Sequence, residues 1–310
     1  MQTRITALGV IALAAWAKGS GNFVRPQAAA PPESVRFRFA PADGTRFTCT
    51  LKTLRKKSSG GRSQIDRGTT VAKVEIKKRE GGYDVIETIT SVEMERDGAP
   101  APDIISKAFI GVSVTSVIDE SGQLTDIQGL AAVLSGLQQS LSAKAAQALG
   151  ELISEEALIQ KNKAEWRGRI GDSVGKTARV GEVWKGQSDY ALPTGGSITY
   201  NTATRFVGWE KVSGRQCLRI RYAYTSDATA LGGFLREKMD ALYKRLEMEN
   251  PGFDLQKANM RGAGERLIDP QTMLIYWEIN KRVIRLPMRV ASQNLPVTVV
   301  EQRDYRYEYE

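Results

Sequence analysis

Residues 171–226 read GDSVGKTARVGEVWKGQSDYALPTGGSITYNTATRFVGWEKVSGRQCLRIRYAYTS and hold the clearest alternation of apolar and polar side chains in the chain. In a half-buried strand, successive side chains point to opposite faces of the sheet. The even-numbered residues from Ile198 to Phe206 share one such face. After a turn signal at Ser213-Gly214, a second strand repeats the pattern with Leu218, Ile220, Tyr222 and Tyr224. The stretch therefore predicts β-hairpins in an antiparallel sheet with one apolar side.

The front of this stretch also matches three active-site patterns. Residues 171–175, GDSVG, fit the Gly-x-Ser-x-Gly nucleophile elbow, but the chain contains no histidine to complete a Ser-His-acid relay. Ser173 and Lys176 fit Ser-x-x-Lys, a pattern that normally opens a helix, and Gly175 between them disfavours a helix. Residues 175–177, GKT, resemble the end of a phosphate-binding loop with one residue too few between its glycines. We interpret the motifs as turns and assign no catalytic residue; a Ser-Lys hydrolase is the remote alternative.

The N-terminus predicts export. Arg4 is followed by an almost unbroken apolar run from Ile5 to Trp16, and residues 15–17, AWA, supply a small-x-small cleavage pattern. The run falls short of the about 20 residues that span a bilayer, so residues 1–17 indicate a secretory signal and the mature chain has no transmembrane segment; an uncleaved anchor is the alternative. Residues 18–34, with their Gly, Ala and Pro, indicate a flexible lead-in.

Charge and composition limit the classes of partner that we expect. The chain of 310 residues carries a net charge of +9, and removal of Arg4 with the signal leaves +8. A basic exported protein is attracted to anionic surfaces such as acidic lipids. The positive charges are scattered along polar strand faces, however, and no recognised nucleic-acid-binding module accompanies them. An anionic lipid or another envelope component is therefore the partner class we expect, and nucleic acid is not expected.

Cys49 and Cys217 are the two cysteines of the chain. Two cysteines in an exported protein suggest a disulfide. Their strand phases oppose it, because Cys49 shares an apolar face with Phe47 and Leu51 whereas Cys217 shares a polar face with Arg219 and Arg221. The sequence leaves open a Cys49–Cys217 bond or two free thiols. It predicts neither a metal site nor a cofactor, since two isolated cysteines without histidine cannot close a tetrahedral shell.

Most of the chain from Val35 alternates strand and turn. Turn signals lie at Asp43-Gly44, Gly81-Gly82 and Asp97-Gly98. Residues 119–122, DESG, begin like a calcium loop but place glycine at the fourth position instead of the sixth, which favours a hairpin. The closing strand puts Val297, Val299, Tyr305, Tyr307 and Tyr309 on one face.

Two helical segments interrupt the strands. Apolar residues recur at three- and four-residue spacing from Ile127 to Leu152, where Gly136 and Gly150 weaken the pattern, and again from Ala230 to Met248. The sequence predicts an α+β domain, mainly β, over residues 35–310. It is built on a large antiparallel curved sheet, resembling half a barrel, with these two amphipathic segments packed against it. Whether it is one unit or two halves, 35–165 and 166–310, stays open.

Tyrosines supply the candidate ligand-lining residues. They alternate on two strands at Tyr222, Tyr224, Tyr305 and Tyr307. Such a ladder can line a ligand cavity, although cross-strand aromatic pairs also stabilise sheets without any ligand.

Four fragments carry a resemblance that spans most of the mature chain. Residues 117–124 (VIDESGQL), the turn 171–173, residues 206–220 (FVGWEKVSGRQCLRI) and residues 262–269 (GAGERLID) look like a broad group of uncharacterised exported bacterial proteins. In that group each fragment is a hairpin or strand of a β-rich domain. Where the group has Gly-Asp-Ser-Trp, this chain has Val174. The order of strands, helix and strands is also similar to curved-sheet lipoprotein carriers, and this second similarity concerns architecture only.

These observations predict a non-enzymatic bacterial protein of the periplasm, the cell envelope or the secreted fraction that binds an amphipathic or anionic envelope component such as lipid. A structural or protein-interaction module without a small-molecule ligand is the alternative.

Overall fold

The computed structural model describes residues 33–101, 109–139, 154–191, 197–226, 228–245, 258–287, 289–290 and 293–310. Residues Pro32–Glu310 form one compact unit. The predicted signal segment, 1–17, and all but the end of the predicted lead-in, 18–34, lie outside the described residues.

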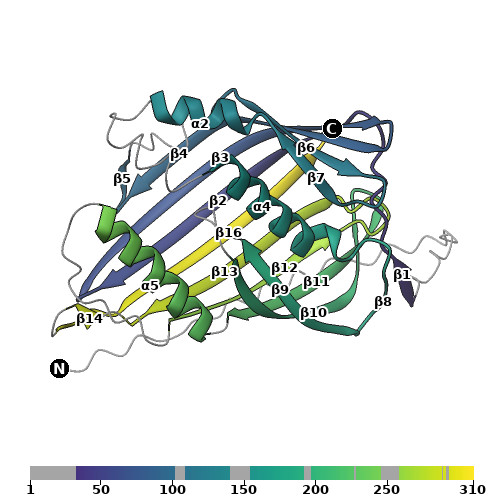
Figure 1. Ribbon diagram of the computed structural model, residues 1–310. Coiled ribbons are helices and arrows are strands. Elements are labelled where there is room, and N and C mark those ends of the chain that lie inside the picture. Colours follow the sequence, from purple (N-terminus) through teal and green to yellow (C-terminus); the bar gives the residue numbers. More distant parts are fainter. Residues whose placement is uncertain are drawn as a thin grey trace, which may run out of the picture. The chain divides into compact units, whose positions relative to one another are not determined.

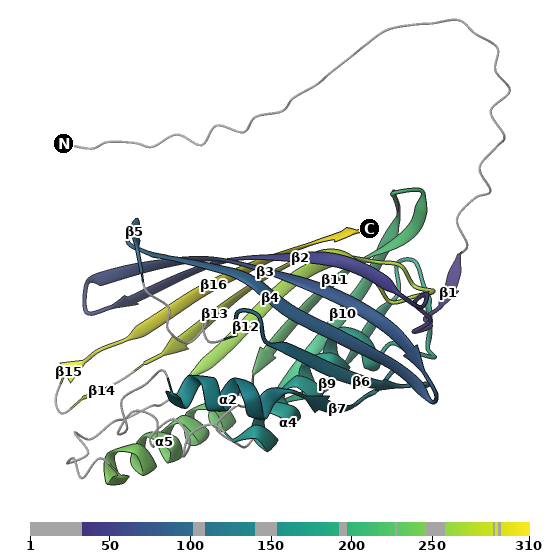
Figure 2. The ribbon, with the colours of Figure 1, turned by 90° about the horizontal axis from the view of Figure 1, so that it is seen from above.

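A large antiparallel sheet is the centre of the fold (Figure 1). Its neighbours follow the order β7-β6-β4-β3-β2-β16-β13-β12-β11-β10-β9, with β5 added beside β4. In the described part of the chain its strands are β2 (Thr45–Ser59), β3 (Arg62–Arg79), β4 (Gly82–Arg96), β5 (Ala99–Pro100), β6 (Ser113–Asp119), β7 (Leu124–Gln128), β9 (Val183–Ala191), β10 (Ser197–Val212), β11 (Arg215–Ser226), β12 (Asn259–Ile268), β13 (Ile275–Leu286) and β16 (Val297–Tyr309). The sheet is curved (Figure 2). It is also unclosed, because the end strands β7 and β9 do not pair with each other.

Two short pairs complete the strands. β1 (Ser34–Arg36) pairs with β8 (Thr177–Arg179), and β14 (Arg289–Val290) pairs with β15 (Gln293–Asn294). Val35, Phe37 and Phe39 are all buried, as their alternation predicts, but only residues 34–36 belong to a strand.

The predicted turns are present. Gly44, Gly81 and Gly98 all have positive φ, and the loop between β6 and β7 is a hairpin turn in which the Gly122 N–H donates to the Asp119 carbonyl at 2.9 Å. The interpretation of residues 119–122 as a turn is confirmed. The prediction of a mainly β, α+β fold on a curved antiparallel sheet is confirmed as well.

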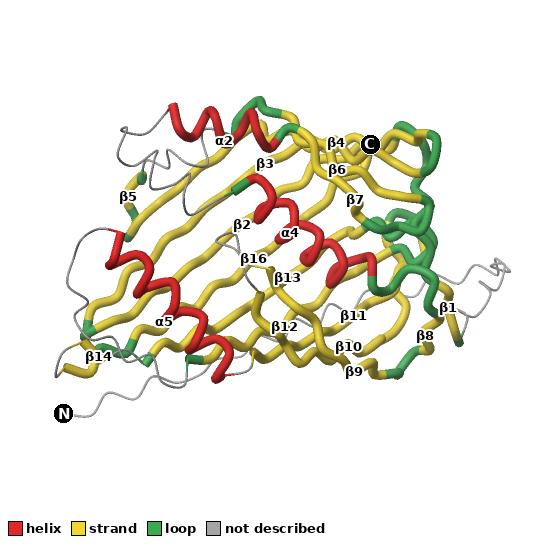
Figure 3. Tube along the Cα trace, in the orientation of Figure 1, coloured by secondary structure: helices red, strands yellow, loops and turns green. Residues whose placement is uncertain are grey.

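All described helices lie on the concave face of the sheet (Figures 1 and 3). They are α2 (Leu130–Gln139), α4 (Glu155–Trp166) and α5 (Ala228–Arg245), and a single π-helical turn, η1 (Arg167–Gly171), continues α4. α2 and α5 correspond to the two predicted segments, whose ends at 140–152 and 246–248 lie outside the described residues. α4 was not predicted. It crosses the 165/166 position at which the sequence left a division of the domain open.

The main core packs part of α4 against the concave face of the sheet. Its fully buried side chains include Phe37, Ile118, Phe206 and Leu218, and Leu158, Ile159 and Trp166 of α4 pack against them. Aromatic rings meet edge-on at the centre, with Phe39 5.5 Å from Trp166 between ring centroids. Apolar burial on one face therefore holds α4 over the middle of the sheet.

Candidate functional site

A cavity of about 380 Å³ lies between α4 and the concave face of the sheet. The strands β9 to β13 and β16 supply its floor and far wall, and η1 with the turn at residues 172–176 supplies its roof. Cavities of this volume hold one drug-sized molecule. The predicted residues Tyr222, Tyr224 and Tyr305 line it, together with Trp184, Tyr200, Thr202, Met260 and a set of charged side chains.

Two glycines on β12 determine how the tyrosines of β11 lie. Gly264 is directly opposite Tyr222, and Gly262 is directly opposite Tyr224. A Cβ added at Gly264 would come within 2.4 Å of the Tyr222 hydroxyl, and one at Gly262 within 2.2 Å of the Tyr224 ring. The rings therefore lie flat across β12, in space that any other residue would fill.

Because the rings lie flat, the tyrosine hydroxyls reach the next strand, β13. The Tyr222 hydroxyl donates to Glu278 Oε1 at 2.6 Å and accepts from Asn280 Nδ2 at 3.0 Å. The Tyr224 hydroxyl donates to Asn280 Oδ1 at 3.4 Å. The tyrosines thus form part of the cavity floor.

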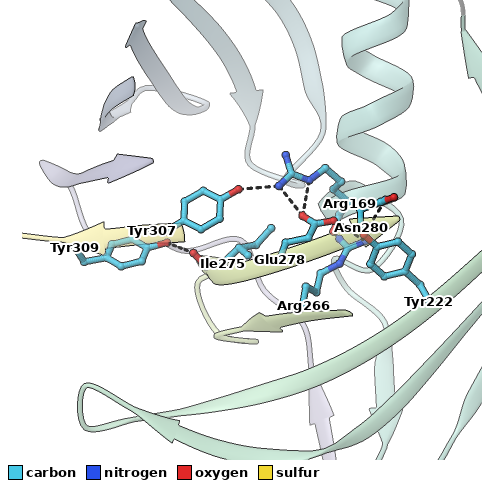
Figure 4. A network of polar contacts seen from close by, with 8 residues as sticks. All are labelled: Arg169, Tyr222, Arg266, Ile275, Glu278, Asn280, Tyr307 and Tyr309. Atoms are coloured by element: carbon cyan, nitrogen blue, oxygen red, sulfur yellow. Dashed lines mark hydrogen bonds and ion pairs between the residues drawn. The ribbon is translucent and has the colours of Figure 1, made fainter. Parts of the chain in front are cut away.

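Arg169 enters the site from the π-turn η1 (Figure 4). The turn is closed by the Asp172 N–H, which donates to the Arg167 carbonyl at 2.9 Å, and π-turns inside helices are frequent at functional sites. Arg169 Nη2 donates to Glu278 Oε2 at 2.7 Å and to the Tyr307 hydroxyl at 2.8 Å. Arg266 Nη1 donates to the Arg169 carbonyl, so the roof is tied to the sheet at both its side chain and its backbone.

Glu278 is 3% exposed and ionised. Burial alone would raise the pKa of its carboxyl, but Arg169, Arg266 and the Tyr222 hydroxyl lower the pKa to about 2. Burial opposes the charge of Arg169 as well, and the attraction of Glu278 holds the pKa of Arg169 well above its ordinary value. The two groups form a charged pair inside the fold.

A row of alternating charge crosses the concave face beside this pair. Its members stand directly opposite one another on β13, β16, β2, β3 and β4, in the order Arg282, Glu301, Arg55, Asp66 and Arg96. Opposite charges in cross-strand pairs attract each other. Glu301 accepts from Arg282 Nη2 at 2.9 Å and from Arg303 Nε at 2.6 Å. Arg282, Glu301 and Arg303 also line the cavity.

The opposite end of the cavity is apolar. Tyr200, Tyr224 and Met260 belong both to its wall and to a separate buried cluster. That cluster continues through Ile198 and Ile284 to Leu231 and Leu235 of α5. The cavity therefore joins a charged region under η1 to an apolar region under α5.

The GDSVG motif forms a turn, as predicted. It begins at Gly171, the last residue of the helical turn η1, and precedes strand β8, whereas a nucleophile elbow runs from strand to helix. Ser173 and Lys176 both line the cavity, and the Lys176 N–H donates to the Ser173 carbonyl at 3.1 Å. The Lys176 ammonium lies 5.5 Å from the centroid of the Trp184 ring.

Of the predicted site residues, Tyr222, Tyr224 and Tyr305 line one cavity and Tyr307 adjoins it through Arg169. Whether they bind a ligand stays a prediction. The sequence analysis missed Arg169, Arg266 and Glu278. A signal was present for Arg266, because it shares its strand phase with Met260 and Ile268, both of which are buried.

Cys49 and Cys217 are free thiols, so the disulfide that the sequence left open is not formed. Strands β16, β13 and β12 lie between β2, which carries Cys49, and β11, which carries Cys217. The expectation of a polar surrounding for Cys217 was wrong: it is fully buried against Leu267 and Tyr276. Burial raises the pKa of Cys49 to about 11 and that of Cys217 to about 12, so both are protonated.

No described helix is both long and apolar enough to span a membrane. Nor does any group of three or more Cys, Asp or Glu side chains within the described ranges come close enough together to hold a metal ion.

No protein-family profile and no curated protein matches the chain. Among solved structures, Pseudomonas aeruginosa OccK5 (OpdH) aligns at 8% identity over 86% of this chain and 98% of that one, with a TM-score of 0.26. A DUF1329 family protein from Desulfovibrio piger aligns at 9% identity over 84% and 85%, with a TM-score of 0.19. Pseudomonas aeruginosa OccK11 (OpdR) aligns at 6% identity over 86% and 98%, with a TM-score of 0.19. The chain is thus weakly similar to these β-rich structures, and TM-scores this low support no conclusion about its function.

Proposed function

We propose that this protein is an exported, non-enzymatic binding protein that holds one amphipathic small molecule in the cavity beneath α4. The observation that carries the proposal is the cavity itself, because a single space of about 380 Å³ joins a charged wall to an apolar one. A molecule with a polar head and an apolar tail matches both walls at once. Export rests on the signal-like residues 1–17.

Native mass spectrometry of chain 18–310, purified from a bacterial envelope without harsh detergent, tests the proposal. We expect a discrete added mass of lipid size. A matched pair of variants shows whether that mass sits in the cavity. Thr202 lines the cavity, whereas its neighbour Asn201 is exposed on the opposite face of the same strand.

Thr202→Phe fills part of the cavity and should abolish the added mass, while Asn201→Phe should keep it. A clean apo mass for the wild type would contradict the proposal and favour a protein-interaction module, to be pursued by cross-linking in the envelope. An added mass retained in Thr202→Phe would place the ligand elsewhere.

The absence of catalysis is part of the proposal and has its own test. Ser173 and Lys176 are the side chains at the cavity that a hydrolase would use. Activity of the wild type on ester or amide substrates of the envelope, lost in Ser173→Ala and kept in Asn201→Phe, would overturn the non-enzymatic assignment.

A further inference from the structure

The charges on the floor and roof of the cavity do not balance. The floor and roof hold four arginines and two glutamates, a set we call the arginine floor: Arg169, Arg266, Arg282, Arg303, Glu278 and Glu301. Its net charge is therefore +2. Glu278 is shared between Arg169 at 2.7 Å and Arg266 at 3.9 Å, and Glu301 is shared between Arg282 and Arg303.

The rim does not supply the missing negative charge. Lys176 and Lys185 face three acids there, Glu165, Asp172 and Asp189, which leaves the whole lining at +1. Two of those acids are already engaged. Glu165 forms an ion pair with Lys161 at 2.9 Å, and Asp189 accepts a hydrogen bond from Thr199 at 2.6 Å.

Arg266 is the buried arginine of the arginine floor. Arg266 is 6% exposed, and its Nε belongs to no hydrogen bond or ion pair among the described residues. Its guanidinium stacks 4.5 Å from the centroid of the Tyr222 ring, which fixes its plane. A planar guanidinium matches the paired oxygens of a carboxylate or phosphate, and the guanidinium groups of Arg169, Arg282 and Arg303 belong to residues that line the same cavity.

From these observations we infer that the ligand of this cavity is an acid, with a carboxylate or phosphate head group against the arginine floor. Its apolar tail lies toward α5, along Tyr200 and Met260. This inference rests on the proposed function and adds the sign of the ligand's charge and its direction in the cavity.

The test compares four probes of equal chain length on chain 18–310, by displacement of a fluorescent fatty-acid analogue below the micellar concentrations. The probes are dodecanoate, dodecyl phosphate, dodecanol and dodecyltrimethylammonium. The anions should bind at least about tenfold more tightly than dodecanol, because hydrogen bonds to charged groups are worth that much or more. The cation should bind most weakly.

Variants on β16 assign the effect to the arginine floor. Arg303→Gln should weaken both anions by about tenfold and leave dodecanol unchanged. Arg306→Gln is the matched control, since it removes the same charge from the opposite face of the same strand, where Arg306 pairs with Asp304. Arg303→Lys keeps the charge and should retain part of the anion preference.

The possible failures are distinguishable. If none of the four probes binds, the proposed function fails. If dodecanol binds as tightly as the anions, or if Arg303→Gln and Arg306→Gln behave alike, only the present inference fails. A preference for dodecanoate over dodecyl phosphate, or the reverse, identifies the head group, and either one supports the inference. The probe comparison uses the wild-type protein, so it decides the matter even if a variant does not fold.

Discussion

Glu278 of β13 connects side chains from three other elements at the site. It accepts hydrogen bonds from Arg169 of η1 and Tyr222 of β11, and it faces Arg266 of β12. Loss of this carboxylate would leave the buried Arg266 and the half-buried Arg169 without their acidic partner. A buried pair broken on one side is usually strongly destabilising, because the remaining charge is uncompensated.

The depressed pKa of Glu278 sets the sign of its pH dependence. Its pKa is about 2 in the folded protein and 4.5 ordinarily, so the folded state binds fewer protons than the unfolded state between these values. The stabilisation is fully present above about pH 5 and is lost as the pH falls toward 2. Its size is on the order of 3 kcal/mol.

Glu278→Gln should lower the free energy of unfolding at pH 7 by about 3–5 kcal/mol. It should also flatten the loss of stability between about pH 5 and 2, because the titrating group is gone. Urea unfolding across that pH range measures both effects. Glu93→Gln, at an exposed position of β4, is the control and should behave as the wild type. A Glu278→Gln variant that keeps the wild-type pH profile would show that other carboxylates cause the acid sensitivity.

At the scale of single residues, the sequence predicted the tyrosines of the site but not the charged side chains that they contact. Alternation alone placed Tyr222 and Tyr305 on an inward face. Arg169 could not be found this way, because its position depends on a π-turn and it lies 109 residues from Glu278 in the sequence. The contact between Arg169 and Glu278 arises only when the sheet is assembled.

Strand β12 shows how small residues shape the site at the scale of an element. Gly262 and Gly264 leave room for the rings of Tyr224 and Tyr222. Because these two positions of β12 carry no side chain, the tyrosine rings form the cavity floor there. In the sequence, the part of this strand from Gly262 onward belongs to the fragment GAGERLID, which carried the resemblance to exported proteins.

Gly262→Ala should destabilise the protein by about 1–3 kcal/mol, because the new methyl group overlaps the Tyr224 ring and raises it into the cavity. Tyr224→Ala in the same chain should relieve the overlap, so the double variant should be more stable than the sum of the single effects implies. Chemical unfolding of all four chains measures the coupling. Gly186→Ala, whose methyl group would have no neighbour closer than 3.9 Å, is the control. Additive effects would contradict the contact.

Helix α4 was not predicted because its apolar residues are few and irregularly spaced, whereas the periodic apolar residues of α5 indicate a helix. A local signal existed at its start. Ser154 precedes Glu155 and Glu156, and its hydroxyl accepts from the Ala157 N–H at 3.1 Å. A Ser followed by acids is typical of a helix N-terminus.

Ser154→Ala should therefore cost about 1 kcal/mol of stability, and Ser154→Asp should restore it, because the carboxylate caps the same N–H and favours the helix dipole. Thermal unfolding and amide exchange across residues 155–166 measure the change. If the alanine and aspartate variants were equally stable, the cap would contribute nothing to α4.

At the scale of the whole molecule, the last strand of the sequence lies in the middle of the sheet. β16 pairs with β2 on one side and with β13 on the other, so it joins the strands of the N-terminal half to those of the C-terminal half. The sequence predicted each strand from its alternation but not this order, because alternation says which face a residue takes and nothing about its neighbouring strand.

A chain that ends at residue 296 should lose cooperative folding, because it exposes the pairing edges of β2 and β13 together. Chain 18–310 is the comparison, and circular dichroism during urea unfolding is the measurement. Adding the peptide 297–310 in trans should restore a folding transition, and a scrambled peptide of the same composition should not. A sharp transition in the truncated chain alone would show that the two parts of the sheet fold independently.

The central place of β16 also sets a minimum time for completing the sheet during synthesis. Ser59 at the end of β2 pairs with Arg62 of β3 soon after it is made, but its partner on the other side, Val297 of β16, is made 238 residues later. Ribosomes add about 5–20 residues per second, so that interval lasts roughly 10–50 seconds. Until it ends, the two parts of the sheet cannot join around the cavity. The secretory signal that the sequence predicts for residues 1–17 is compatible with such a delay, because a chain whose sheet is still incomplete can be exported before it folds.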